Sequence, residues 1–445
     1  MSEILKPRYY KHIDKIITPS DLKNVERKIK NKSYIIHHGF YPFLSYTIHF
    51  EKFVKTKDEH QKVTHKRQDK KRPIKYAAHI DRCIYQWYSY EINNAYNNYC
   101  NQNYLNKCVI AYRTCLKGRT NIEFAKEVFD FIKKTQSCYI LVSDFTDFFD
   151  TIEHEKLKSK LCEILNVRNL DLDFYKVFRS MTKYAYIEKV EILQYLKVKG
   201  ITDDAIKNGK SLFEQIPWKV AKKDLKNEIK INRESYGIPQ GSPLSGVFAN
   251  VYMIDFDKSI SNYVDSKDGL YLRYSDDLII IIPTNQLNSI EDIWQEVSKI
   301  KGKYKTLKMN INKTSGYIYE NNKIRSLHRD IKGMKDGGKL ISYLGFSFDG
   351  KNVKFRDKTL TNFFYKLYRR IDGMKKREKY RLLKKKKRHT KIDKHQILKV
   401  LDSNQKARKF IDYVNRANRV FKGEKYISNF RKNIKNKVFR RFNKK

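Results

Sequence analysis

The sequence predicts an α+β protein with a basic helical domain at its C-terminal end, and three observations support this fold class. Short apolar runs such as Cys138–Val142 and Leu278–Ile282 have the length of buried strands, and each adjoins acidic residues. Residues 351–445 contain 35 Lys or Arg against 7 Asp or Glu, so their net charge is +28. Apolar residues in this basic part recur at helical spacing, at Phe363, Phe364, Leu367, Tyr368, Ile371 and Met374.

The composition points to a polyanionic partner. The 445 residues include 95 Lys or Arg and 49 Asp or Glu, a net charge of +46 that is too large for an ordinary small-molecule enzyme. The first 20 residues lack the apolar core of a signal peptide, and no apolar run approaches the roughly 20 residues of a membrane-spanning helix. The six cysteines show no CxxC spacing, which argues against a zinc site or a disulfide framework. We therefore expect a cytoplasmic protein that handles nucleic acid and has no membrane partner.

The chain divides by composition into an N-terminal extension (1–70), a main domain (71–350) and the basic helical domain (351–445). Within the main domain, helices are expected around the strand Cys138–Val142, and a variable Lys-rich helical insertion at about 166–235. A further short strand is expected at Ile341–Phe348, which contains Gly345. The change in charge density places a domain boundary near Gly350.

Carboxylates follow two of the predicted strands. In SDFTDFFDTIEH, Asp144 follows an apolar strand, and Asp147 and Asp150 come three and six residues later, a spacing typical of a turn that leads into a helix. In RYSDDLIIII, Asp276 and Asp277 interrupt two apolar half-strands, which predicts a hairpin with both residues at its tip. An ordinary turn is one explanation, because Asp is favoured in turns. Mg²⁺ binding is the other, because neighbouring carboxylates repel, and two ions about 3.5–4 Å apart would neutralise them and serve phosphoryl transfer.

A third segment, YGIPQGSPLSGVFANVYM, predicts a tight loop followed by a helix. Gly237, Pro239 and Gly241 fix a loop whose backbone can approach a ligand closely, and Gln240 stands at its apex. A helix is expected to start near Pro243 with Ser242 as its cap. Taken alone, the segment is equally typical of an ordinary loop-to-helix junction.

In this order, the three segments resemble the palm motifs of reverse transcriptases, over about residues 70–350. DFTDFFDTIEHEKL, GIPQGSPLSGVFANVYM and YSDD are similar to the three palm motifs, and KMNINKT and ISYLGFSFDG to the two that follow them. KRPIKYAAHIDRCIYQW and AYRTCLKGR resemble the two fingers motifs, with Asp81 and Arg82 as an Asp-Arg pair. The resemblance implies a right-hand polymerase with fingers, a palm built on an antiparallel sheet, and a basic helical thumb.

The resemblance also implies roles for individual residues. Asp144 and Asp276 would bind two Mg²⁺ ions, or alternatively Mn²⁺, supported by Asp277 and the backbone carbonyl of Phe145. The incoming nucleotide would be contacted by Arg113, Lys117, Arg119, Phe149, Gln240 and Lys313. Template and primer would be contacted by Gly241, Ser242, Tyr274, Leu344, Gly345 and the basic face of 351–445.

Phe149 and Lys313 are the positions with the most specific implied functions. The aromatic side chain of Phe149 would clash with the 2′-hydroxyl of a ribonucleotide and so select deoxynucleotides. The alternative is that Phe149 is an ordinary core residue. Lys313 would shield or protonate the pyrophosphate. The alternative is that Lys313 is an ordinary solvated lysine on the surface. A primer 3′-hydroxyl would attack the α-phosphate of a deoxynucleoside triphosphate, with catalysis by positioning and charge neutralisation.

Among reverse transcriptases, the chain resembles the bacterial retron, group II intron and defence-associated branch. No Cys/His cluster or RNase H pattern follows the basic domain, so the chain looks most like a stand-alone defence-associated (abortive-infection) enzyme. This resemblance implies a structured noncoding RNA and an RNA/DNA template–primer duplex as partners, deoxynucleoside triphosphates as substrates, and a role in antiphage defence. The alternatives are a retron or intron-type enzyme, a protein-primed or template-independent DNA synthase, and a non-catalytic RNA-binding scaffold. A second copy of the chain or a second protein is left open as a partner.

Overall fold

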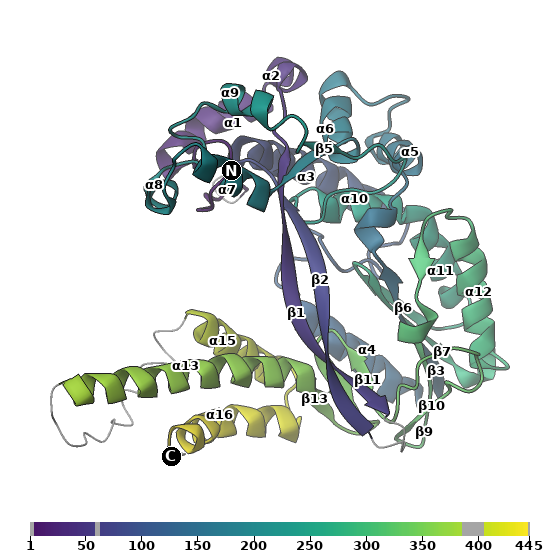
Figure 1. Cartoon of the computed structure of the whole chain (residues 1–445). Helices are drawn as coiled ribbons and strands as arrows, with labels where there is room; N and C mark the ends of the chain where they lie inside the picture. The colour runs from purple at the N-terminus through teal and green to yellow at the C-terminus, as the bar shows by residue number, and fades with distance from the viewer. Residues whose placement is uncertain (1–3, 58–62, 385–404, 444–445) are drawn as a thin grey trace.

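The structure is a computed structural model that describes residues 4–57, 63–384 and 405–443. Helices and antiparallel sheets occur together along the chain, so the protein is α+β, as the sequence predicts. Figure 1 shows an N-terminal helical part at the top, a central sheet with its helices at the right, and long C-terminal helices below. None of the described helices combines the length and the apolarity that a bilayer-spanning segment requires.

The central sheet has β3 in its middle and antiparallel pairing throughout, in the order β10-β9-β3-β7-β6. Its strands are β3 (Cys138–Thr146), β6 (Leu270–Tyr274), β7 (Asp277–Pro283), β9 (Ser315–Glu320) and β10 (Lys323–Ser326), and β8 (Lys308–Met309) pairs with the end of β3. The two predicted apolar strands are therefore neighbours. One expectation was wrong in detail: Asp144 lies within β3, which continues to Thr146, because β8 supplies pairing beyond the apolar run.

Both faces of the sheet are buried, which explains the unbroken apolar run of β7. The helices on it are α10 (Ser245–Tyr252), α11 (Ile254–Asp265) and α12 (Ile290–Gly302) on one face and α4 (Asn121–Thr135) on the other. Leu278 and Ile280 belong to the first hydrophobic core, whereas Ile279 and Ile281 belong to the second. The ends of β3 and β7 are therefore held from two sides.

Residues 4–57 and 63–76 form helices and two long strands, where the sequence predicts only an N-terminal extension. The elements are α1 (Leu22–Lys30), α2 (Lys32–His37), β1 (Phe43–Lys57) and β2 (Val63–Tyr76). The strands β1 and β2 make a long antiparallel ribbon from Leu44↔Tyr76 to Lys57↔Val63, which runs from the N-terminal helices past the central sheet (Figure 1). In β1, Leu44, Tyr46, Ile48 and Phe50 alternate with polar residues, which is a strand pattern that sequence reasoning missed, whereas β2 is mostly polar and charged and gives no such signal.

The region 166–235, for which the sequence predicts a variable helical insertion, contains four helices and also two short strands that the prediction did not include. Its elements are α6 (Leu172–Thr182), β4 (Ala185–Glu188), α7 (Lys189–Val198), α8 (Asp203–Asn208), α9 (Trp218–Asp224) and β5 (Lys230–Ile231). Strand β4 runs parallel to the start of β1 and pairs with β5 on its other side. The region is thereby joined to the base of the ribbon in one four-stranded sheet.

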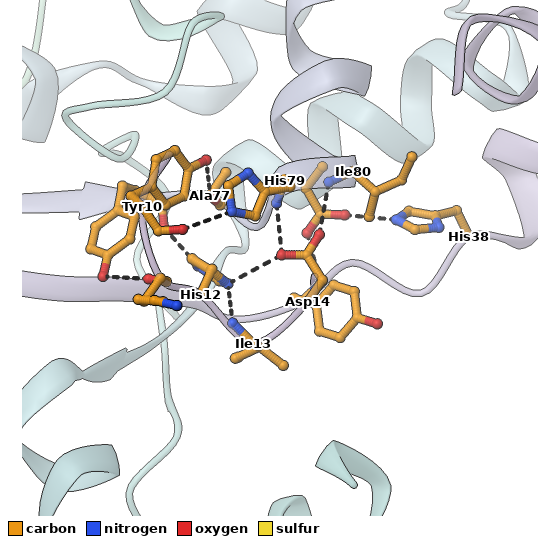
Figure 2. A network of polar contacts seen from close by, with 12 residues as sticks. Tyr10, His12, Ile13, Asp14, His38, Ala77, His79 and Ile80 are labelled. Carbon is orange, nitrogen blue, oxygen red and sulfur yellow. Dashed lines mark hydrogen bonds and ion pairs between the residues drawn. The ribbon is translucent and has the colours of Figure 1, made fainter. Parts of the chain in front are cut away.

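A buried polar network fixes the N-terminal segment to the start of α3 (His79–Gln102), as Figure 2 shows. The Asp14 carboxylate accepts hydrogen bonds from the backbone N–H groups of His79 and Ile80, each at 2.8 Å. The first turn of a helix leaves such donors free, and Asp14 satisfies them from 65 residues away in place of a local N-cap. The N-terminal segment thus stabilises the helix that precedes the active-site elements.

Two further members of this network are titratable. The His12 ring accepts a hydrogen bond from Ile13 N–H at Nδ1 (2.8 Å), and its Nε2 lies 3.1 Å from the Tyr76 carbonyl. Burial lowers the pKa of His12 to about 3, so the ring is neutral. Asp81, from the predicted Asp-Arg pair, is also buried and contacts His38 Nε2 at 2.7 Å. Burial is the main cause that raises the pKa of Asp81 to about 6.

The C-terminal part begins with a small sheet rather than with helices. Its elements are β11 (Ile341–Tyr343), β12 (Phe346–Phe348), β13 (Val353–Phe355), α13 (Asp357–Lys384), α15 (Gln405–Val420) and α16 (Lys425–Asn443). The single strand predicted at Ile341–Phe348 was wrong: Leu344 and Gly345 have φ of 45° and 93°, and they form a hairpin turn between β11 and β12. The small sheet spans Gly350, and one hydrophobic core joins α4 to the three C-terminal helices. The sequence also predicts a solvated connection or helix extension at Lys375–Arg388. Its last residues fall in 385–404, which lie outside the described residues.

Candidate active site

Three acidic residues lie on neighbouring parts of β3, β7 and the turn that precedes β7. Asp144 is paired with Asp277 in the strand register, and the backbone N–H of Phe145 donates to the Asp276 carbonyl at 3.1 Å. Ser275 has φ of 62° and forms the turn between β6 and β7 together with Asp276. We call residues 274–277 the catalytic turn. The pairing of β3 with β7 fixes the relative position of the acidic residues, because both strands are buried on either side.

The negative charges of this cluster raise the affinity of one carboxylate for a proton. Asp277 still touches solvent, but the surrounding protein shields it from water, and this desolvation is the largest cause that raises its pKa to about 6. The charges of Asp276 and Asp144 raise it further, and those of Arg356 and Lys313 lower it. The site is therefore a locus of unbalanced negative charge in a strongly basic protein.

Lys313 already neutralises part of this charge. It ends the short 3₁₀ helix η4 (Ile311–Lys313), and its Nζ lies 3.0 Å from Oδ2 of Asp144. The other oxygen of that carboxylate, Oδ1, is buried and has no hydrogen-bond partner. A buried carboxylate oxygen without a donor is costly, so this atom is poised to accept a ligand.

The residues present fit a divalent cation by their chemistry. Asp144, Asp276, Asp277 and the Phe145 carbonyl offer only oxygen ligands, which are the donors that Mg²⁺ and Mn²⁺ prefer. The unpartnered Oδ1 of Asp144 supports the same conclusion. Within the described residues, no three Asp, Glu, His or Cys side chains already converge as metal ligands. Binding would therefore bring the carboxylates closer together.

A buried ion pair that sequence reasoning missed holds the catalytic turn. Arg273 and Asp257 are fully buried, and the guanidinium binds the carboxylate in a bidentate manner at 2.6 and 2.7 Å. The same guanidinium donates to the carbonyl of Ser275 at 2.9 Å, and Tyr271 OH donates to Asp257 at 2.8 Å. Arg273 is thus a positioning residue for the acidic pair. An arginine inside the apolar strand LYLRY was the signal that could have revealed it.

The loop before α10 packs against the first residues of the predicted palm. The backbone N–H of Ile238 donates to the Phe149 carbonyl at 2.9 Å, and Lys75 N–H donates to the Gln240 carbonyl at 2.9 Å. Gly241 has φ of 124°, and a Cβ there would stand 2.6 Å from the Lys75 carbonyl, so only glycine fits. The loop therefore brings the partly exposed Gln240 next to Phe149 and to the base of the ribbon.

The predicted helix start at Pro243 was wrong by two residues. Helix α10 begins at Ser245, and the backbone N–H of Leu244 reaches the Ser242 hydroxyl at 3.4 Å. The Ser245 hydroxyl folds back to the Pro239 carbonyl at 2.6 Å, and this bond keeps Pro243 in the loop. Ser242 is buried, so its side chain supports the loop more than it faces a ligand.

Phe149 lies at the edge of the hydrophobic core. Phe148, its neighbour, is buried and stacks on Phe145 at 5.5 Å between ring centroids. Phe149 is half-buried, with its ring 5.7 Å from that of Phe148. Its backbone carbonyl accepts from Ile238 N–H, as described above, which joins this residue to the loop that carries Gln240. Phe148 is thus the core residue of the pair, and Phe149 packs against that core with its side chain partly exposed.

The structure does not bring all predicted nucleotide contacts to the carboxylates. Arg113 is buried, and its guanidinium donates to Asn97, Asn106 and the Val109 carbonyl. A structural role is therefore the better interpretation for Arg113, because a triphosphate needs a free guanidinium.

Lys117 and Arg119 are exposed in a loop that contacts the C-terminal helices. Arg119 pairs with Glu127 and lies over the Phe124 ring, and Arg416 of α15 donates to the carbonyl of Gly118 in the same loop. This loop therefore lies at the junction of α4 and α15, and no contact of Lys117 or Arg119 with the carboxylates is seen among the described residues.

The remaining predicted template and primer contacts lie on two turns. Tyr274 ends β6, directly opposite Asp277 in the strand register. Leu344 and Gly345 form the turn between β11 and β12, where the Leu344 carbonyl accepts from Asn121 Nδ2 at 2.8 Å. A Cβ at Gly345 would lie 3.4 Å from the Tyr413 hydroxyl of α15. This turn therefore lies between the start of α4 and α15.

Comparison with known proteins gives a family for residues 64–348, which match the family described as "Reverse transcriptase (RNA-dependent DNA polymerase)". No curated protein matches the sequence. Solved structures that match include apo telomerase from Candida tropicalis, truncated from its C-terminal domain (13% identity, TM-score 0.38), which covers 77% of this chain and 61% of the telomerase chain.

Two further telomerase structures show the same level of similarity. The apo telomerase from Candida tropicalis has 13% identity and a TM-score of 0.38, and it covers 80% of this chain and 57% of its own. Telomerase from Candida albicans in complex with a fragment of telomeric RNA has 13% identity and a TM-score of 0.34, and the match covers 77% of this chain and 55% of the telomerase chain. The chain thus spans somewhat more than half the length of these telomerases.

Proposed function

Because the chain belongs to the reverse transcriptase (RNA-dependent DNA polymerase) family, we propose that it extends a primer 3′-hydroxyl with deoxynucleoside triphosphates on an RNA template. The observation that carries the proposal is the pairing of Asp144 with Asp277 at the catalytic turn, with Asp276 beside them. Acidic residues on adjoining buried strands, next to one lysine, suit phosphoryl transfer and little else.

The chain's own residues would position the reacting groups. Reverse transcriptases in general use divalent metal ions, and here Asp144, Asp276, Asp277 and the Phe145 carbonyl would hold two Mg²⁺ ions. When bound, these ions supply charge neutralisation at the reacting phosphate. Lys313, whose ammonium lies 3.0 Å from Asp144, would stay near the pyrophosphate side and could donate a proton there.

Two residues would select the nucleotide. Phe149 is partly exposed, and its backbone is bonded to the loop that carries Gln240; its aromatic ring would clash with a 2′-hydroxyl and so select deoxynucleotides. Gln240 offers both a donor and an acceptor and would contact the nucleotide or the templating base pair. The bond between Lys75 N–H and the Gln240 carbonyl would keep this loop in register with the ribbon.

The C-terminal helices would hold the template–primer duplex. They are joined to the central sheet through β11, β12 and β13 and through the shared core, so charges on them keep a fixed relation to the site. Basic side chains on these helices that the structure shows as exposed include Lys366, Arg369, Arg370, Lys376, Arg377, Arg408, Lys409, Arg419 and Lys425. Such side chains contact phosphates independently of sequence and give binding that weakens steeply with salt.

We also propose, on the resemblance of the motifs alone, that the template is a structured noncoding RNA and that the enzyme acts in antiphage defence. Purification of the protein from its own cells, followed by separate sequencing of the bound RNA and DNA, tests this. A single enriched RNA with complementary DNA supports the proposal. A retron-like or intron RNA would replace it with one of the alternative classes, and DNA attached covalently to a tyrosine would indicate protein priming.

The polymerase proposal itself is tested by primer extension with purified protein. We expect templated incorporation of deoxynucleotides that requires Mg²⁺ or Mn²⁺ and is abolished in Asp276→Ala. The matched control is Asp265→Ala, which removes an acidic residue from the C-terminal end of α11 and should leave extension unchanged. Equal extension by the Asp276→Ala variant would refute the assignment of the site.

A further inference from the structure

Tyr112 lies between α10 and the catalytic turn, and none of the predicted roles includes it. A Cβ added at Gly246 of α10 would stand 2.7–2.9 Å from three atoms of the Tyr112 ring, so the ring covers this glycine closely. The Tyr112 hydroxyl donates to the Ser275 hydroxyl at 3.3 Å. The ring therefore bridges the helix and the turn that carries Asp276 and Asp277.

The backbone at Tyr112 is held in a strained conformation. Its φ is 57°, which is uncommon for a bulky residue and persists only where the surroundings impose it. Asn93 Nδ2 donates to the Tyr112 carbonyl, and Asn250 Nδ2 donates to the Ala111 carbonyl at 2.8 Å. Arg113, the next residue, is buried and anchored by three acceptors, as described above. Several buried side chains thus serve to place one exposed ring.

The segment is also tied to the strand that carries the positioning arginine. Ile110 N–H donates to the Arg273 carbonyl at 3.1 Å, and Arg273 N–H donates to the Cys108 carbonyl at 2.8 Å. Because Arg273 also holds the Ser275 carbonyl, Tyr112 and the catalytic turn are fixed to the same framework.

The outer face of the ring is open. Tyr112 is 48% exposed, although one face of its ring lies on Gly246. Among the described residues, no aromatic ring and no cationic side chain packs against it. A core tyrosine would be covered. A positive φ alone is not distinctive, because the exposed Tyr104 has one too, but at Tyr112 the carbonyl is held by the buried Asn93 and the ring lies against α10. The arrangement is that of a flat apolar platform beside the acidic residues.

We propose that the open face of Tyr112 is a binding surface for a nucleobase at the growing end of the template–primer duplex. The inference rests on the proposed function, because the primer 3′-hydroxyl must reach Asp144 and Asp276 and so brings the terminal base pairs to this place. An aromatic ring suits this role, because every base has a π face and contact with it is independent of sequence. The ring also places no charge next to the acidic site.

The test combines variants of Tyr112 with an abasic scan. Tyr112→Gly removes the ring and suits the positive φ, and Tyr112→Phe keeps the ring but loses the hydroxyl. We expect Tyr112→Gly to weaken binding of the duplex end about 5- to 150-fold, the range of one base–aromatic stack, with normal thermal stability. Tyr112→Phe should stay within about fivefold of wild type. The matched control is Tyr104→Gly, which alters an exposed tyrosine at φ of 59° outside this site.

The abasic scan identifies the contacted base. Each of the terminal nucleotides of template and primer is replaced in turn by an abasic residue, and affinity is measured for wild type and Tyr112→Gly. At one position, the abasic residue should weaken binding by the wild-type protein as much as the Tyr112→Gly substitution does. At that same position it should weaken binding by Tyr112→Gly no further. Additive effects at every position would overturn the inference, as would wild-type affinity of Tyr112→Gly. Failure of wild type to extend any primer would instead count against the proposed function.

Discussion

Replacement of Arg273 by methionine should cost both stability and activity, and the structure gives the size of the first effect. The substitution leaves Asp257 as a buried charge without its bidentate partner, and breaking a buried ion pair costs about 3–5 kcal/mol. The Ser275 carbonyl loses its donor at the same time. We therefore expect the free energy of unfolding to fall by about this amount in urea denaturation, with an unchanged m value.

A triple variant separates stability from positioning. Arg273→Met, Asp257→Leu and Tyr271→Phe together remove both charges and the hydroxyl. The Ser275 carbonyl is then the group left without its donor, which costs about 1–3 kcal/mol. Stability should recover toward wild type, while single-nucleotide extension should stay far below it, because the catalytic turn still lacks its anchor.

The control for this series is an exposed ion pair. Lys299 lies 3.4 Å from Glu296 and is 73% exposed, so Lys299→Met should change the free energy of unfolding by about 0–1 kcal/mol and leave extension intact. If the triple variant extends the primer as fast as the wild-type protein, Arg273 serves stability alone. An Arg273→Met protein as stable as wild type would contradict the magnitude taken from its burial.

Three further predictions concern the sugar, pH and salt. Phe149→Ala should lower the preference for deoxynucleotides by at least about tenfold, which equals about 1.4 kcal/mol, in single-nucleotide extension; unchanged preference would reduce Phe149 to a core residue. Folding lowers the pKa of His12 from 6.5 to about 3, so on acidification the unfolded chain takes up the proton before the folded chain does. The contribution of neutral His12 to the free energy of unfolding is therefore fully present above pH 6.5. It falls as the pH drops below 6.5, by up to about 2 kcal/mol at pH 5. In urea denaturation at pH 6.5 and at pH 5, His12→Gln should reduce the difference in the free energy of unfolding between the two pH values. The exposed control His37→Gln should keep this difference. The triple variant Lys366→Gln, Arg369→Gln and Arg370→Gln removes three exposed charges of α13. It should reduce the slope of log K against log salt concentration for duplex binding by about 2.7, and an unchanged slope would place the duplex elsewhere.

The choice of charge substitutions over truncation follows from the structure. The sequence places a boundary near Gly350, where charge density changes. The backbone there continues from β12 into β13, and the side chains of Phe346, Phe348 and Phe355 share one core with α4 and the C-terminal helices. Removal of 351–445 would expose this core, so loss of binding by such a truncation would not distinguish lost charge from lost folding.

The acidic site was predictable because its signals are local. A strand of the length of Cys138–Val142 followed by Asp144, and a hairpin with Asp276 and Asp277 at its tip, each depend on a few neighbouring residues. Their pairing follows, because two buried apolar strands that end in acidic residues have few other partners in a sheet. The resemblance to a family then ordered the pieces.

What the sequence concealed depends on distant partners. Strand β2 of the ribbon is mostly polar and charged, so only its pairing with the alternating residues of β1 defines it. Asp14 caps α3 from 65 residues away, and Arg113 is buried by asparagines from α3 and from the loop after it. Arg113 also shows why a motif match does not fix a role, because its guanidinium is already saturated by protein acceptors.

Tyr112 and Arg273 share a physical reason for having been missed. Each lies next to a recognised motif, and each acts through contacts with residues that are remote in sequence, Gly246 for one and Asp257 for the other. A charged residue inside an apolar strand and an aromatic residue before a buried arginine were the available signals. Neither signal has a meaning until the fold shows what surrounds it.

The most direct test of the account is synthesis of DNA by the purified full-length chain on an RNA template with an annealed primer. With deoxynucleoside triphosphates and Mg²⁺ or Mn²⁺, we predict a product complementary to the template, far less product with ribonucleoside triphosphates, and none from Asp144→Ala or Asp276→Ala. Product formation by these two variants, or a product whose sequence does not follow the template, would contradict the assignment of Asp144 and Asp276 as the catalytic centre of an RNA-directed DNA polymerase.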